Sequence, residues 1–234
     1  MPRPTPNSAK NTSTSQPLVK RLLLVDDHPI MRHGLAQLIR NEEGLEVCAE
    51  AGTARAGLDA VGEFKPDLVV IDLTLPDKNG LELLKDIQAV YPGTLCLVLS
   101  MHDESMYGER ALRAGARGYI MKEAAADHLI TAARKVLNGG IYVSDSMASR
   151  MLEQVTGNRQ KTSTAAIDTL TDRELEVLEL IGQGVATKLI AERLNISART
   201  VEAHRAHIKE KLSITDGLAL VRHAVQWVEQ QAGL

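Results

Sequence analysis

Hydrophobic positions divide the chain into two regions with different patterns. In the first region, short apolar runs rich in Val, Ile and Leu alternate with stretches of helical length. The runs are continuous rather than alternating, which is typical of strands buried on both faces of a sheet. They cover Arg21–Val25, Leu45–Ala51, Asp67–Asp72, Thr94–Ser100 and Ala116–Met121.

The stretches between these runs place apolar residues at helical spacing. They cover Pro29–Arg40, Thr53–Phe64, Gly80–Val90, Glu104–Ala114 and Ala126–Asn138. A strand–helix unit that repeats in this way predicts a parallel sheet with helices on both faces. The first region is therefore predicted to be an α/β domain with a doubly wound (βα)5 fold.

The second region, Thr169–Leu234, contains no strand-like run and is predicted to be all-α. Thr171 and Glu174 form a capping box that starts its first helix. Later helices are predicted at Lys188–Leu194, Ala198–Leu212 and Asp216–Gln231, and the tight turn between the first two gives the form of a helix-turn-helix. The predicted domains are a disordered tail at 1–17, the α/β domain at 18–146, a polar linker at 147–167 and the helical domain at 168–234.

Composition and charge exclude several classes. The chain carries 27 Lys and Arg against 30 Asp and Glu, and its 2 cysteines are too few for a disulfide scaffold. Its 1 Trp, 4 Tyr and 1 Phe argue against binding of single strands by base stacking. The sequence shows no apolar run of membrane length and no secretory signal, so we expect a cytoplasmic protein without a membrane partner.

Acidic residues end two of the predicted strands. Asp26 and Asp27 follow the first strand, and Asp72 closes the third. In an open α/β sheet, ligands bind outside the carboxyl ends of the strands, and a strand order of 2-1-3-4-5 would bring these acids together. Carboxylates this close need compensation, which Mg²⁺ provides through oxygen ligands. Ser100 and Lys122 end the fourth and fifth strands, so the set suits a phosphoryl group, with a carboxylate as nucleophile.

Each of these residues also has an ordinary structural explanation. An Asp at a strand end is often only a turn or cap residue. His28 beside Asp27 is better explained by its position before Pro29, which starts a helix, than by acid–base chemistry. Cys48 and Cys96 are predicted to be small core residues. Only the joint placement of the acids, the hydroxyl and the lysine at strand ends favours a site.

The first region resembles the receiver domain of bacterial two-component response regulators. The resemblance rests on VDDHP (Val25–Pro29), VVIDLTLPDKNG (Val69–Gly80), LVLS (Leu97–Ser100) and GYIMK (Gly118–Lys122). It implies that Asp72 accepts a phosphoryl group from a sensor histidine kinase.

The resemblance also implies roles for the residues around the acceptor. Asp26, Asp27, Asp72 and the backbone carbonyl of Thr74 would hold Mg²⁺. Ser100 and Lys122 would contact the phosphoryl group, and Tyr119 would be the aromatic side chain that changes rotamer. The only chemistry expected is Mg²⁺-dependent self-phosphotransfer and self-dephosphorylation at Asp72, so the protein is not expected to be an enzyme.

A local positive stripe on the second region suits contact with phosphates. Val201, Ile208 and Leu212 share one face of the predicted Ala198–Leu212 helix, which is expected to pack. The opposite face can enter a major groove with its N-terminus first. The candidate DNA contacts are Lys188, Arg199, Thr200, Glu202, Ala203, Arg205, Ala206 and Lys209. Glu202 could accept from cytosine, although an ion pair with Arg205 or Arg199 is the alternative.

This region resembles the LuxR-type helix-turn-helix. The segments that carry the resemblance are LTDRELEVLELIGQG (Leu170–Gly184), KLIAERLNIS (Lys188–Ser197) and RTVEAHRAHIKEKL (Arg199–Leu212). A receiver followed by this module is typical of the NarL/FixJ subfamily of response regulators. The resemblance implies a transcription factor that binds double-stranded DNA and forms a homodimer when phosphorylated. Before phosphorylation, the receiver is expected to block or misplace the helical domain.

Two other classes fit less well. A Mg²⁺-dependent phosphohydrolase would place its nucleophile and acid in one motif after the first strand, whereas the candidate nucleophile here follows the third. A dinucleotide-binding module would show a glycine-rich G-x-G-x-x-G turn after the first strand, which the sequence lacks.

Overall fold

The structure, a computed structural model, describes residues 19–155, 164–167 and 169–232. The predicted disordered tail at 1–17 lies outside the described residues, as does part of the predicted linker. Five parallel strands form one sheet in the order β2-β1-β3-β4-β5, which confirms the predicted order. The strands are β1 (Lys20–Val25), β2 (Leu45–Ala51), β3 (Leu68–Ile71), β4 (Leu95–Ser100) and β5 (Tyr119–Met121).

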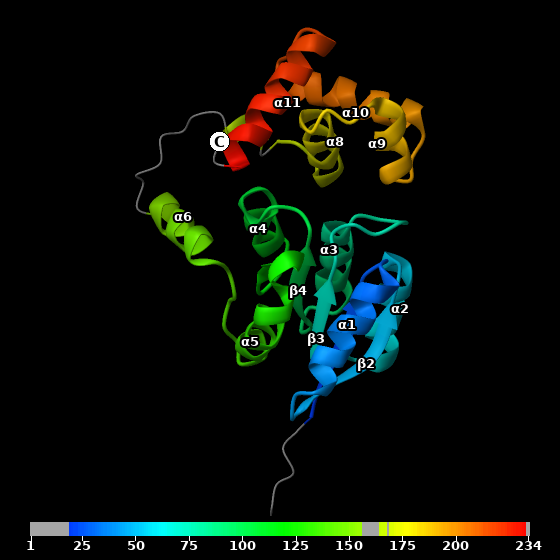
Figure 1. Cartoon of the computed structure of the whole chain (residues 1–234), viewed down its shortest axis with the longest axis vertical. Coiled ribbons are helices and arrows are strands. Elements are labelled where there is room, and N and C mark those ends of the chain that lie inside the picture. The colour runs from blue at the N-terminus through cyan, green and yellow to red at the C-terminus, as the bar shows by residue number, and fades with distance from the viewer. Residues whose placement is uncertain (1–18, 156–163, 168, 233–234) are drawn as a thin grey trace, which may run out of the picture.

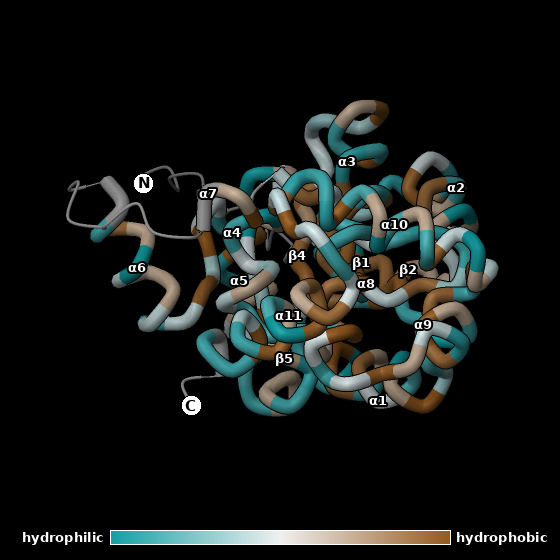
Figure 2. Tube along the Cα trace, turned by 90° about the horizontal axis from the view of Figure 1, so that it is seen from above, coloured by the Kyte–Doolittle hydropathy of each residue, from teal (hydrophilic) through white to brown (hydrophobic). Residues whose placement is uncertain are grey.

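Helices cover both faces of the sheet (Figure 1). One apolar cluster joins the sheet to helices α1 and α5, and the second joins it to α2, α3 and α4. The strands are the apolar centre of this domain, while the helices mix polar and apolar positions (Figure 2). The bounds are α1 (Pro29–Arg40), α2 (Ala54–Phe64), α3 (Gly80–Val90), α4 (Glu104–Arg113), the short 3₁₀ helix η1 (Lys122–Ala124) and α5 (Ala125–Leu137).

The chain after α5 returns to the sheet. The Tyr119 N–H donates to Tyr142 O over 2.9 Å, and the Tyr142 N–H donates to Arg117 O over 2.9 Å. Gly118 is needed at this contact, because a Cβ atom there would lie 2.6 Å from the Tyr142 carbonyl oxygen. Tyr142 therefore closes the β5 edge of the sheet.

The segment predicted as a linker contains two helices, α6 (Asp145–Val155) and α7 (Thr164–Ile167). Met147 of α6 is 2% exposed and packs on α4 beside Gly108. The predicted boundary at 146/147 thus falls inside α6. A single buried methionine in a polar stretch gives too weak a periodic signal to predict this helix.

The helical domain follows its prediction closely. The predicted capping box at Thr171 and Glu174 is present, and Val201 and Ile208 are fully buried. Asn195 has a φ of 51° in the turn before α10, a left-handed conformation that Asn tolerates. The helices are α8 (Asp172–Gly182), α9 (Thr187–Arg193), α10 (Ala198–Lys211) and α11 (Gly217–Ala232).

The two domains pack against each other. Helix α8 lies across the end of the α/β domain where the strands β3 and β4 end, while α10 and α11 lie farther from the sheet (Figure 1). One apolar cluster is continuous from the sheet into α8, with Leu175 and Leu178 fully buried. Within the part of the chain that the structure describes, no helix is long and apolar enough to cross a membrane.

Candidate functional site

Three charged side chains meet at the carboxyl ends of the central strands. Asp26 follows β1, Asp72 follows β3, and the Asp72 N–H donates to Val25 O over 2.8 Å, which fixes the two ends side by side. Lys122 Nζ lies 2.6 Å from Asp26 Oδ2 and 2.7 Å from Asp72 Oδ2. All three side chains are almost completely buried. The lysine therefore offsets part of the negative charge of the two carboxylates.

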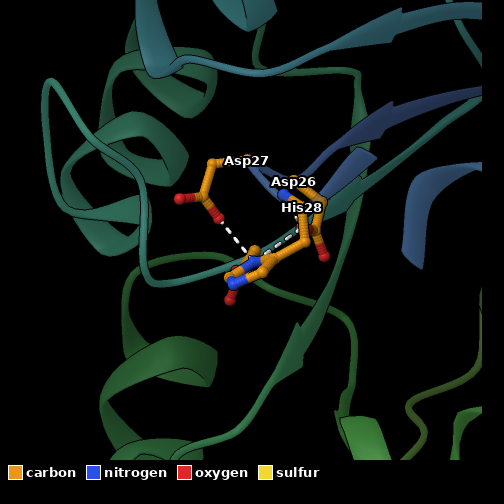
Figure 3. Close-up of side chains that lie close together, drawn as sticks. Asp26, Asp27 and His28 are labelled. Carbon is orange, nitrogen blue, oxygen red and sulfur yellow. Dashed lines mark hydrogen bonds and ion pairs between the residues drawn. The ribbon is translucent and has the colours of Figure 1, made fainter. Parts of the chain in front are cut away.

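Asp27 and His28 lie next to Asp26, as Figure 3 shows. His28 Nδ1 lies 2.7 Å from Asp27 Oδ1, and His28 is the N-cap residue of α1 before Pro29, as predicted. One ligand atom from each of Asp26, Asp27, His28 and Asp72 can be chosen so that all lie within 4.8 Å of one another. Asp26 Oδ2 and Asp27 Oδ1 are buried without a well-directed hydrogen bond, despite the nearby nitrogen atoms. Buried carboxylate oxygens in this state fit a hard divalent cation such as Mg²⁺.

Burial and mutual contact shift the pKa values of Asp72 and Lys122. Burial raises the pKa of Asp72 above its usual value, and the nearby Lys122 only partly offsets this effect. Burial alone would lower the pKa of Lys122, but the charge of Asp72 and the close contacts with Asp26 and Asp72 raise it overall. The lysine therefore stays a cation at neutral pH, and a further positive charge would stabilise ionised Asp72.

The loop after β3 is held tightly around Asp72. The Thr74 N–H donates to Asp72 Oδ1 over 3.2 Å, and the Gly80 N–H donates to Leu73 O over 2.8 Å. A Cβ atom at Gly80 would lie 2.0 Å from the Asp72 carbonyl oxygen. Gly80 is therefore required for the conformation of this loop, although the sequence analysis did not assign it a role beyond the motif.

Ser100 and Tyr119 both contact the main chain of His102. Ser100 is fully buried, and its Oγ accepts a hydrogen bond from the His102 N–H over 3.2 Å. The Tyr119 hydroxyl donates to His102 O over 2.7 Å, and its ring is buried. The structure thus brings Ser100 and Tyr119 together through His102, a residue for which the sequence analysis predicted no role.

The imidazole of His102 links the two domains. Its Nδ1 lies 2.9 Å from Glu179 Oε2 on α8, and its Nε2 lies 3.2 Å from Thr74 Oγ1. Burial alone would lower the pKa of His102, but the hydrogen bond and charge of Glu179, with smaller contributions from Glu176 and Asp72, raise it. Tyr107 also donates to Glu179 Oε2, over 2.8 Å.

Helix α8 presents an acidic stripe to the α/β domain. Asp172, Glu176 and Glu179 lie on one helix face, at spacings of four and three residues, and each is less than 10% exposed. Lys85 Nζ donates to Asp172 Oδ2 over 2.8 Å, and the Asn79 side chain donates to Glu176 Oε1 over 2.5 Å. These acids are thus interface residues, and their spacing in the sequence was the signal that could have revealed this.

The predicted DNA-reading face of α10 lies open. Six candidate residues are exposed: Lys188, Arg199, Thr200, Glu202, Ala203 and Ala206. Arg205 and Lys209 are half-buried at the rim. Glu202 accepts from Thr187 Oγ1 over 3.1 Å and lies 3.6 Å from Arg205 Nε, as the ion-pair alternative predicts. The α/β domain contacts α8 rather than this face, which argues against blocking of the recognition helix in this arrangement.

The fold and these sites define a response regulator with a separate DNA-binding domain. The family described as response regulator receiver domain matches residues 22–134, and the bacterial regulatory proteins of the luxR family match residues 168–224. The chain belongs to the receiver–LuxR response regulators, the NarL/FixJ subfamily, and is a DNA-binding transcription regulator.

Similar proteins cover nearly the whole chain. The oxygen regulatory protein NreC of Staphylococcus haemolyticus is 34% identical over 210 residues, which are 88% of this chain and 97% of the relative. NreC of Staphylococcus carnosus is 33% identical over the same shares.

Solved structures agree with this assignment. A LuxR-family response regulator from Aurantimonas is 36% identical, with a TM-score of 0.55, over 59% of this chain and 99% of the other. RcsB of Salmonella enterica serovar Typhimurium, bound to promoter P1flhDC with the phosphomimetic BeF₃⁻, is 25% identical, with a TM-score of 0.59, over 88% of this chain and 98% of the other.

Proposed function

We propose that Asp72 accepts a phosphoryl group from a sensor histidine kinase and that this modification controls dimerisation and DNA binding. The observation that carries the proposal is the buried cluster in which Lys122 Nζ lies within 2.7 Å of carboxylate oxygens of both Asp26 and Asp72. In this cluster the Asp72 carboxylate lies beside a cation and two further acids, which supports a role as nucleophile with Mg²⁺ bound next to it.

The reaction follows from these positions. A carboxylate oxygen of Asp72 attacks phosphorus, the new P–O bond forms, and the P–N bond to the kinase histidine breaks. Phosphoryl transfer depends mainly on positioning and charge neutralisation. Mg²⁺, held by Asp26, Asp27, Asp72 and the carbonyl of Thr74, would supply positive charge beside the transferred group.

The remaining residues supply contacts to the phosphoryl oxygens. Lys122 can pair with the phosphoryl group without leaving the cluster, and the Ser100 hydroxyl can donate to it. The Tyr119 ring would then take up the space that Ser100 leaves. The same cluster would return the phosphoryl group to water, so self-phosphotransfer and self-dephosphorylation are the only chemistry proposed.

For DNA, we propose that α10 enters the major groove N-terminus first. Arg199, Glu202, Ala203 and Ala206 would face the groove, while Lys188, Thr200, Arg205 and Lys209 would contact phosphates at its rim. Phosphorylation would favour a homodimer whose two recognition helices bind two half-sites. Because the proposed ligand is chromosomal DNA, we place its action in the cytoplasm.

Mass measurement tests the phosphoryl site directly. The protein is incubated with acetyl phosphate and Mg²⁺, and the intact mass is compared for wild type, Asp72→Asn and Asp59→Asn, a control at an exposed carboxylate on α2. We expect wild type and Asp59→Asn to gain one phosphoryl group and Asp72→Asn to gain none. Equal labelling of all three would refute the assignment of Asp72.

A gel-shift titration tests the link to DNA. Genomic DNA fragments are selected with the phosphorylated protein and then titrated with wild type and Asp72→Asn, each with and without acetyl phosphate and Mg²⁺. We expect a gain in affinity for wild type only. Equal affinity and an unchanged dimer population in wild type would count against phosphorylation as the switch.

A further inference from the structure

The main chain of His102 is hydrogen-bonded to the two side chains that are expected to move on phosphorylation, those of Ser100 and Tyr119. Its N–H donates to Ser100 Oγ and its carbonyl accepts from the Tyr119 hydroxyl. Its ring Nε2 lies 3.2 Å from Thr74 Oγ1, on the loop that follows Asp72. A displacement of Ser100 and Tyr119 therefore changes hydrogen bonds on both sides of the His102 backbone.

The same ring holds a carboxylate of the DNA-binding domain. Glu179 is 6% exposed, and its Oε2 is reached by His102 Nδ1 at 2.9 Å and by the Tyr107 hydroxyl at 2.8 Å. His102 Nδ1 donates to the Glu179 carboxylate, because a carboxylate can only accept. In a neutral His102 ring, Nε2 therefore accepts a hydrogen bond from the Thr74 hydroxyl. A buried carboxylate that loses a charge-assisted hydrogen bond carries a desolvation cost, so loss of the His102 contact weakens the docking of α8, which Lys85, Arg110 and Asn79 also hold.

We propose that His102 and Glu179 form a latch that keeps α8 docked until Asp72 is phosphorylated. The inference rests on the proposed function, because it requires a phosphoryl group on Asp72. When Ser100 turns toward that group, the His102 N–H loses its acceptor, and the segment from Ser100 to His102 shifts. The imidazole then withdraws from Glu179, and α8 separates from the receiver.

The latch acts on α8 and not on the recognition helix. Arg199, Glu202, Ala203 and Ala206 of α10 are exposed while α8 is docked. Docking therefore restricts where the DNA-binding domain can stand relative to a second copy, rather than covering its DNA-reading face. Release lets the DNA-binding domains of two copies occupy two half-sites at once. Before phosphorylation, the receiver would thus misplace the helical domain rather than block it.

A contact inside the interface reports docking in the full chain. Lys85 Nζ lies 2.8 Å from Asp172 Oδ2, so a short treatment with a water-soluble carbodiimide can join them as an amide. Peptide mass spectrometry gives the yield of this cross-link, and intact mass gives the phosphorylated fraction after acetyl phosphate and Mg²⁺ are removed. The quantity compared is the ratio of yields without and with phosphorylation.

Three variants separate the latch from the interface as a whole. His102→Ala removes the link, and Glu179→Met removes the acceptor at similar volume. Asn195→Gly is the matched control, because it removes another contact between the domains, Asn195 Nδ2 to Pro76 O at 2.9 Å, and suits the left-handed backbone there. Glu179→Met also keeps the test valid if His102→Ala fails to fold.

The expected result is a cross-link yield in wild type that falls about 5- to 150-fold on phosphorylation, the usual range of coupling between sites. Asn195→Gly lowers both yields but keeps a similar ratio, whereas the ratio approaches one in His102→Ala and Glu179→Met. If those two variants kept the ratio of wild type, or if phosphorylation left the cross-link yield of wild type unchanged, the latch would be overturned but the proposed function would not. Absence of any mass gain in wild type would instead refute the proposed phosphorylation.

Discussion

Removal of the Lys122 charge should expose the electrostatic cost of the phosphoryl site. In Lys122→Met, a side chain of similar length leaves Asp26 and Asp72 facing each other, both at most 4% exposed. Loss of one partner from a buried ion cluster costs about 3–5 kcal/mol. We therefore expect the free energy of unfolding to fall by about that amount at pH 7 without divalent cations.

Acid should reduce this deficit, and Mg²⁺ should raise the free energy of unfolding of the variant. With Lys122 absent, the pKa of Asp72 in the folded protein rises further above its unfolded value. Such a group destabilises the fold once the pH exceeds its ordinary value, so the deficit should shrink as the pH falls toward about 4. Mg²⁺ at about 100 times its dissociation constant adds about 2.7 kcal/mol by mass action.

Urea unfolding followed by circular dichroism measures these differences. Wild type, Lys122→Met and the exposed-lysine control Lys188→Met are compared at several pH values, with and without Mg²⁺. The control should stay within about 0.5 kcal/mol of wild type. If Lys122→Met were as stable as wild type without metal, or insensitive to both acid and Mg²⁺, the charge of Lys122 would not be what stabilises these buried carboxylates.

Three further outcomes follow from the structure. In Gly80→Ala, the new Cβ atom would displace the carbonyl of Asp72. This variant should therefore be about 1–3 kcal/mol less stable than wild type, and should be phosphorylated more slowly in the acetyl phosphate assay. A wild-type rate of phosphorylation would show that the loop tolerates a side chain at this position. Burial raises the pKa of the Cys96 thiol to about 12. At pH 8, iodoacetamide should therefore label Cys96 only after the protein unfolds, and should label the half-buried Cys48 sooner. Rapid labelling of Cys96 in the native protein would contradict this burial. Burial alone would raise the pKa of Glu174, but hydrogen bonds, first from Lys211, lower it overall. Glu174→Gln should therefore lower the free energy of unfolding in urea by about 1–3 kcal/mol at pH 7, and by less as the pH falls below about 4. A loss of stability that does not depend on pH would exclude the charge of Glu174 as its cause.

The strands and most helices could be predicted because their patterns are local. Continuous apolar runs marked all five strands, and the predicted helix at Pro29–Arg40 agrees with α1 at both ends. The fifth strand is shorter than the predicted Ala116–Met121, since at Gly118 the chain forms only an isolated bridge, to Tyr142. That contact joins distant segments, so no local pattern could reveal it.

The candidate site could be predicted because its residues stand at the ends of neighbouring parallel strands. Strand ends meet at one edge of a parallel sheet, so Asp26, Asp72 and Lys122 could be placed together from their positions in the chain. The contact of His102 with Glu179 could not be predicted, because it depends on how the two domains pack. The sequence shows the acidic spacing on α8 but not the donors that it meets.

The return of the chain to the sheet at Tyr142 has a consequence for solubility. An outer strand with free N–H and C=O groups is a template on which another polypeptide can add. On the β5 side, the main chain of Tyr142 already occupies two of these groups. On the opposite side, β2 carries the exposed charged residues Glu46 and Glu50. Both borders of the sheet therefore discourage the addition of a further strand from another copy of the chain.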